Sequence, residues 1–230
     1  MHATKARGIF NAYQLKLLML FLMLLDHMYE FLFPFELLPA HYVARVVAPV
    51  FAFFAAQGMV YTRSREGYLL RLFAAGAVMT AGNFILYLLT GREIPNNIFF
   101  SLAVGAAAVY AIDKCGQNKW WALSIAPLSF ASLFCEGGHL VPLMMLIFYY
   151  LRALPALMYT VYVFAMGLPF FLVFLNTGRM QPQFYMVFAV LPLMLYNGRR
   201  GPDTVFAKYL FYVFYPVHIW ILFIVSFIVE

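Results

Sequence analysis

Long apolar runs follow one another along almost the whole chain, and only short breaks at glycine, proline and charged residues separate them. Roughly 20 apolar residues let a helix cross a bilayer. The breaks define about nine runs, at 11–33, 40–61, 67–89, 96–113, 119–135, 139–151, 155–175, 182–197 and 205–229. The sixth is short, so a tilted or re-entrant segment is an alternative there. The predicted fold is all-α, a polytopic membrane helical bundle with about nine transmembrane helices.

The composition supports a membrane protein. Of the 230 residues, 65% are hydrophobic and only 10% are charged, which is far more apolar than a soluble domain. No soluble domain fits between the runs, so we expect a single transmembrane domain over residues 1–230. The first run carries charges and ends without a small-residue cleavage site, which favours a spanning helix over a signal peptide.

The distribution of lysine and arginine predicts the orientation. With the N-terminus in the cytoplasm and nine crossings, the positive-inside rule places basic residues on the cytoplasmic side. The opposite side receives two, Arg92 and Arg179, and the cytoplasmic side eleven: Lys5, Arg7, Arg63, Arg65, Arg71, Lys114, Lys119, Arg152, Arg199, Arg200 and Lys208. The net charge of +6 is therefore mainly a topology signal and gives no reason to expect a nucleic-acid partner.

A few ionisable residues lie inside the apolar runs, where each costs at least ~2.5 to 3.5 kcal/mol unless it faces a partner or a cavity. Asp26 and His27 are consecutive, so on a helix they point about 100° apart and cannot pair with each other. Arg45, near the outer start of the second run, is the expected partner of Asp26. This ion pair is either purely structural or the support of a site.

Two histidines, His27 in the first run and His218 in the last, are predicted at similar depth in the membrane. Tyr215 precedes His218 by three residues and shares its helix face. Pro216 removes a backbone hydrogen bond, and kinked helices often border cavities. A neutral histidine that merely holds helices together is the alternative interpretation.

The cytoplasmic run YTRSREGYLLRL, which begins at Tyr61, is the densest basic cluster. Its arginines either anchor the topology on lipid phosphates or clamp the phosphates of a ligand that enters from the cytoplasm, because guanidinium groups bind phosphate in a bidentate way. On the other side, Glu136 in CEGGHLVP belongs either to an acceptor loop or to an ordinary turn.

Other chemical signatures are weak in this sequence. We find no Walker loop, no serine nucleophile elbow and no His/Cys spacing typical of a metal site, so no metal is expected. His41 and His139 are expected to be isolated. Cys115 and Cys135 lie at opposite ends of one run and cannot pair, because a disulfide needs Cα atoms within ~7 Å.

Five segments in order resemble the TraX family, named for a conjugation-system protein that N-acetylates pilin. They are LLDH, RVVAPVFAFFAAQGMVYTRSREGYLLRL, NNIFFSLAVGAAAVYAID, EGGHLVPLMMLIFYYLR and KYLFYVFYPVHIWIL. That family is similar in turn to membrane acyltransferases that move an acetyl group from cytoplasmic acetyl-CoA to an extracytoplasmic acceptor. The resemblance implies a multi-pass enzyme of the bacterial inner (plasma) membrane.

The resemblance also implies roles for the candidate residues. His27 is the expected catalytic base or acetyl carrier, supported by Asp26 and Arg45, and His218 joins it in catalysis. The expected contacts of acetyl-CoA are Arg63, Arg71 and Tyr61, and those of the peptide or glycan acceptor are Glu136, Tyr215 and Gln57. Gln57 stands where a glutamate is usual in the family. The competing hypothesis is a small transporter or channel in which His27, Asp26 and His218 relay protons.

Overall fold

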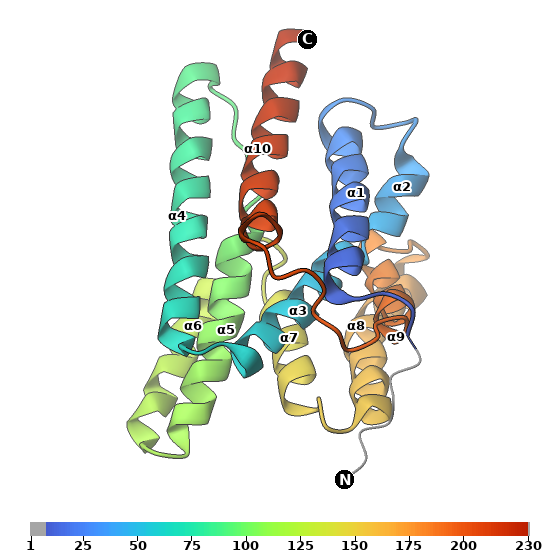
Figure 1. Cartoon of the computed structure of the whole chain (residues 1–230). Coiled ribbons are helices and arrows are strands. Elements are labelled where there is room, and N and C mark those ends of the chain that lie inside the picture. The colour runs from blue at the N-terminus through green and yellow to red at the C-terminus, as the bar shows by residue number, and fades with distance from the viewer. Residues whose placement is uncertain (1–7, 230) are drawn as a thin grey trace. The chain divides into compact units, whose positions relative to one another are not determined.

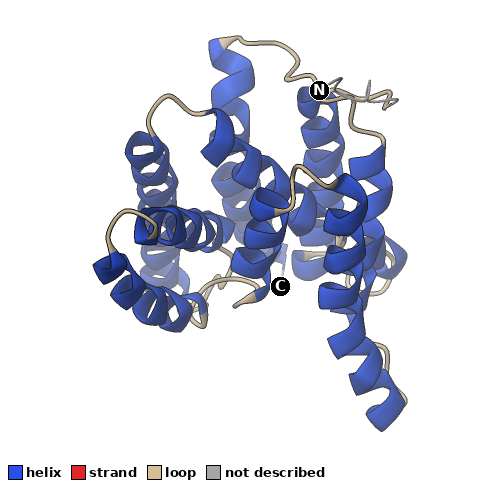
Figure 2. Cartoon of the chain, turned by 90° about the horizontal axis from the view of Figure 1, so that it is seen from below, coloured by secondary structure: helices blue, strands red, loops and turns tan. Residues whose placement is uncertain are grey.

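The computed structural model describes residues 8–229, and within that range the regular secondary structure is helical, as Figure 2 shows. One isolated β-bridge joins Phe10 and Tyr196. The helical secondary structure of the described residues confirms the predicted all-α class. In chain order the α-helices and the 3₁₀ helices (η) are α1 (Ala12–Phe31), α2 (Leu38–Ala44), α3 (Val47–Tyr61), α4 (Arg65–Thr90), α5 (Ile98–Cys115), η1 (Lys119–Ser124), α6 (Ile125–Ser132), α7 (Leu140–Tyr150), α8 (Pro155–Thr177), η2 (Pro182–Ala189), α9 (Val190–Met194) and α10 (Val205–Val229).

Five of the predicted runs are helices long and apolar enough to cross a membrane. They are Leu38–Tyr61, Arg65–Thr90, Ile98–Cys115, Pro155–Thr177 and Val205–Val229. The first of these comprises α2 and α3, with a break in regular helix at Arg45 and Val46. The described part of the chain thus has the helices of a multi-pass membrane protein.

The other four runs take different forms. Helix α1 has 20 residues but contains Lys16, Asp26 and Glu30, and it lies outside that apolar set. Run 119–135 divides into η1 and α6, and run 182–197 into η2 and α9. Helix α7, in the short sixth run, has 11 residues, which at ~1.5 Å per residue is about half of a ~30 Å bilayer core. Nine full crossings stay a prediction.

The chain forms two compact units. The first comprises residues 1–50 and 163–230, and the second residues 51–162; α3 and α8 run from one unit into the other. The expectation of a single transmembrane domain over residues 1–230 stays a prediction.

In the first unit, α1 packs against both α2 and α10, as Figure 1 shows. Its start is fixed by a capping box, in which Asn11 and Gln14 each accept the other's backbone N–H. The preceding residue, Phe10, exchanges backbone hydrogen bonds with Leu195 and Asn197. These contacts fix the N-terminal end of α1, which precedes Asp26 and His27 in the chain.

In the second unit, α5 is the central helix, with α4, α6, α7 and η1 packed against it. Helix α4 starts at the N-cap Ser64, whose side chain accepts the backbone N–H of Gly67, and it ends at Gly91, whose φ of 71° favours glycine. Helix α7 approaches α5 closely at Gly105. A Cβ at this position would lie 2.5 Å from Sδ of Met145 and 3.2 Å from Cα of Pro142.

We predict that Gly105→Ala destabilises the protein by about 1–3 kcal/mol, because the added methyl overpacks the contact between α5 and α7. Thermal unfolding in detergent measures this loss. Gly116→Ala is the matched control, since a methyl at the end of α5 meets no atom closer than 3.6 Å. Equal melting temperatures for the two variants would contradict the prediction.

Candidate functional site

A buried pair of histidines joins α1 to α10 in the first unit. His27 Nδ1 lies 2.9 Å from His218 Nε2, and the two side chains are buried. His218 Nδ1 lies 2.7 Å from the carbonyl oxygen of Phe214. Because that oxygen only accepts, His218 carries its proton on Nδ1 and accepts on Nε2, so His27 donates from Nδ1. The basic nitrogen of neutral His27 is therefore Nε2.

Aromatic rings surround this pair. Phe214 stacks on the ring of His218 with centroids 4.7 Å apart. Tyr215 presents its ring edge-on to both histidines, at 6.2 Å from His27 and 5.9 Å from His218. The structure therefore brings together His27 and His218, which the sequence analysis placed at similar depth, and Tyr215, which it placed on the same helix face as His218. Apolar surroundings favour the neutral imidazole, which is the form that can accept a proton.

Asp26 lies on a different side of α1 and contacts α2. One carboxylate oxygen accepts a hydrogen bond from Arg45, which confirms the predicted ion pair. The other oxygen lies 2.8 Å from His41 Nδ1. The expectation that His41 is isolated was wrong. Helix α2 ends next to Arg45, and this local geometry lets two residues four apart reach the same carboxylate.

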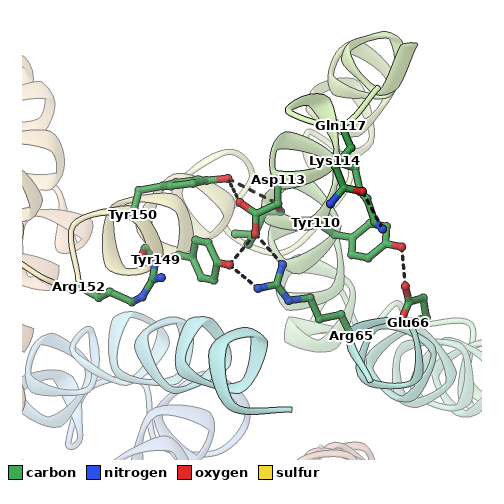
Figure 3. Close-up of polar contacts among 10 residues, drawn as sticks. Arg65, Glu66, Tyr110, Asp113, Lys114, Gln117, Tyr149, Tyr150 and Arg152 are labelled. Carbon is green, nitrogen blue, oxygen red and sulfur yellow. Dashed lines mark hydrogen bonds and ion pairs between the residues drawn. The ribbon is translucent and has the colours of Figure 1, made fainter. Parts of the chain in front are cut away.

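A second polar cluster connects three helices of the second unit, and Figure 3 shows it converging on Asp113. Asp113 Oδ2 accepts from Arg65 and from the Tyr149 hydroxyl, each at 2.6 Å, and Oδ1 accepts from the Tyr150 hydroxyl at 2.9 Å. Arg65 also donates to the Tyr149 hydroxyl at 2.7 Å. The guanidinium of Arg152 lies over the Tyr149 ring, 4.7 Å from its centroid. One carboxylate thus joins the start of α4 to the ends of α5 and α7.

A pocket of about 370 Å³ lies beside this cluster. Its cationic side chains are Arg63, Arg65 and Lys114, and its carboxylates are Glu66 and Asp113. Both carboxylates have donors: Glu66 accepts from the Tyr110 hydroxyl at 2.6 Å, and Asp113 accepts from the donors described above. The remaining lining residues are Thr62, Ser64, Tyr110 and Gln117.

The three residues expected to contact acetyl-CoA differ in position. Arg63 lines the pocket, whereas Arg71 does not; its guanidinium lies 5.8 Å from the centroid of the Tyr68 ring. Tyr61 is the last residue of α3 and is largely exposed. The pocket therefore includes one of the three expected contacts.

The residues expected to contact the acceptor are dispersed. Tyr215 lies beside the histidine pair. In the second unit, Gln57 is a half-buried residue of α3, and Glu136 lies in the turn before α7, where its backbone oxygen accepts from Ser101 at 2.6 Å. His139 was also expected to be isolated, but its Nδ1 is hydrogen-bonded to Ser132. That expectation was wrong.

Sequence reasoning missed Asp113, Tyr149 and Tyr150. Each lies at the end of an apolar run, where polar residues are common, and their sequence separation hides the cluster. Lys114, next to Asp113, was interpreted only as a topology signal. Cys115 and Cys135 are both free, which confirms that they do not pair with each other.

Comparison with known proteins identifies the family. Residues 11–226 match the family described as TraX protein. The chain belongs to the TraX family. It is also 26% identical, over 246 residues, to the probable fimbrial assembly protein FimC, serogroup H1, of Dichelobacter nodosus; this covers 93% of the chain and 94% of that protein. No solved structure matches significantly. The family resemblance found in the sequence is confirmed.

We predict that Asp113→Asn lowers the stability of this TraX-family protein by about 1–3 kcal/mol, because the amide carries no charge and leaves Arg65 and the buried Tyr149 hydroxyl poorly paired. Chemical or thermal unfolding measures the change. The control is Asp203→Asn, whose side chain is 70% exposed and contacts Arg200 at 3.0 Å. Such surface pairs are worth ~0–1 kcal/mol. Similar losses in both variants would show that the three-helix cluster is not stabilising.

Proposed function

We propose that this TraX-family protein is a membrane acetyltransferase. It transfers an acetyl group from cytoplasmic acetyl-CoA to an extracytoplasmic acceptor, either a peptide N-terminal amine or a glycan hydroxyl. The observation that carries this proposal is the buried hydrogen bond between His27 and His218. Membership of the TraX family supports it, because the resemblance implies catalysis at His27.

The geometry of the pair suits proton transfer. The carbonyl of Phe214 accepts from His218, and His218 accepts from His27, so the lone pair of His27 is on Nε2. In the proposed reaction, Nε2 takes a proton from the acceptor nucleophile as that atom bonds to the acetyl carbon. The carbon–sulfur bond breaks, and the proton passes to the thiolate sulfur of CoA. A positioned base of this kind typically contributes ~10²- to 10⁴-fold in rate.

Two arginines, Arg63 and Arg71, and the neighbouring Tyr61 are the proposed contacts of acetyl-CoA. The pocket that includes Arg63, Arg65 and Lys114 supports phosphate binding in this region, because its carboxylates already have hydrogen-bond donors. Guanidinium groups favour phosphate geometry.

The acceptor and the membrane orientation are part of the same proposal. Tyr215, Glu136 and Gln57 are the proposed acceptor contacts. The similarity to a protein named for fimbrial assembly favours a subunit of a surface fibre, such as pilin, as the acceptor. The chain would lie in the bacterial inner membrane with nine crossings and a cytoplasmic N-terminus.

We predict that His27→Ala lowers acetyl transfer about 10²- to 10⁴-fold, and that His218→Ala causes a smaller loss because it acts on His27. The assay is transfer of labelled acetyl from acetyl-CoA to pilin or a peptide amine by the purified protein. Ser226→Ala is the control, because it removes another buried polar group from α10. Full activity of His27→Ala would remove this histidine from the mechanism.

We predict that Arg63→Ala and Arg71→Ala weaken acetyl-CoA binding, and that the effect shrinks as salt rises, because exposed charges are screened within ~8 Å at physiological ionic strength. The measurement is the acetyl-CoA-dependent rise in melting temperature, since a ligand that binds the folded state stabilises it. In kinetics, KM rises more than kcat falls.

Arg179→Ala, which removes an exposed arginine from the other predicted side, is the control for these variants. Unchanged binding in both test variants would leave the basic cluster as a topology anchor. If millimolar acetyl-CoA stabilises none of the proteins, the result would favour the transporter hypothesis.

A further inference from the structure

His41 belongs to a hydrogen-bonded cluster in which its tautomer is fixed. Its Nδ1 lies 2.8 Å from Asp26 Oδ1, and an ionised carboxylate only accepts hydrogen bonds. Arg45 occupies the other carboxylate oxygen, which gives Asp26 the counter-charge that a partly buried carboxylate needs. His41 Nδ1 therefore carries a hydrogen. The nitrogen that can take up a proton is Nε2.

The surrounding groups also hold the His41 ring in place. Tyr29 stacks on it with centroids 4.3 Å apart, and Tyr42 meets it edge-on at 5.9 Å. Nε of Arg45 donates to the backbone oxygen of His41 at 3.2 Å. From η2, which packs against α2, Tyr185 contacts the ring of Tyr42 at 4.9 Å. An oriented imidazole is the arrangement that acid–base catalysis requires.

The two histidine sites differ in exposure. The side chains of His41 and Asp26 are 19% and 17% exposed, whereas His27 is 5% exposed. His41 is therefore less enclosed than the buried pair of His27 and His218. An ion pair between Asp26 and Arg45 alone would already balance the charges. The oriented histidine adds a basic nitrogen to that pair.

If the proposed function holds, the number of protons released during acetylation of an amine gives His41 a role as a second base. A peptide amine has a pKa of about 7.7–8.0 and arrives mostly as an ammonium ion at neutral pH. Its acetylation forms a nitrogen–carbon bond and breaks the carbon–sulfur bond, whose electron pair stays on sulfur. Two protons leave the nitrogen: one reaches the thiolate to give CoA thiol, and the other is released. A neutral hydroxyl loses only one proton.

We propose that His41, oriented by Asp26, is a further catalytic residue that takes the first proton from a protonated amine acceptor. Nε2 of His41 removes this proton and releases it to the outside, which leaves the neutral amine. His27 then takes the second proton during attack on the acetyl group. Arg45 is a positioning residue that acts through Asp26.

The test is the variant His41→Gln, whose amide can still donate to Asp26 but cannot act as a base. At about pH 7, kcat/KM for a peptide amine should fall roughly 5- to 10-fold relative to the parent, because only about a tenth to a sixth of the amine is neutral at that pH. At about pH 9 the amine is mostly neutral, so the variant should approach the parent measured at the same pH. Tyr42→Phe, which keeps the ring beside His41, is the control and should behave like the parent at both pH values.

An equal loss at both pH values, or no loss at neutral pH, would overturn the role of His41 while acetyl transfer by the parent would still support the proposed function. If the parent transfers no acetyl group, both proposals fail. Should His41→Gln not fold, His41→Ala with added imidazole decides the question. Recovery of activity by free imidazole would support a base at this position, and lack of recovery would overturn it.

Discussion

The hydrogen bond between His27 and His218 is the interaction on which the first unit depends. Polar groups in an apolar helix bundle are costly unless each donor has an acceptor. Here the relay ends at the carbonyl of Phe214, so the N–H donor of each imidazole has an acceptor, without a counter-charge. This requirement fixes how α1 and α10 face each other, and it also fixes which nitrogen of His27 is basic. The same contact thus serves packing and the proposed chemistry.

Helix α1 distributes its polar residues between two neighbours. His27 faces α10, and Asp26, one residue earlier, faces α2. The rotation of about 100° per helical residue makes this division unavoidable. Two consecutive residues therefore support two separate histidines, one buried and one partly exposed. In the proposed reaction, the two proton acceptors are the buried His27 and the partly exposed His41.

The second unit solves a related problem with charge instead of neutral histidines. Asp113 is ionic and partly exposed, and three donors from two other helices surround it. Arg65 lines the pocket, but its charge is already paired with the carboxylate of Asp113. Arg63 and Lys114 remain the pocket cations that no described carboxylate contacts within ion-pair distance. The structure thus distinguishes the paired Arg65 from the other two pocket cations, a difference that the composition did not reveal.

The sequence by itself determined the helical class, the TraX family and the helices able to cross a membrane, because long apolar runs and ordered motifs are local properties of the chain. It also predicted that Asp26 pairs with Arg45, since a carboxylate at that depth needs a cation. Only the tertiary structure decided that His41 shares this carboxylate and that Asp113 joins Arg65, Tyr149 and Tyr150. These partners are set by helix rotation and packing, which the apolar pattern leaves open because the runs are hydrophobic on nearly every face.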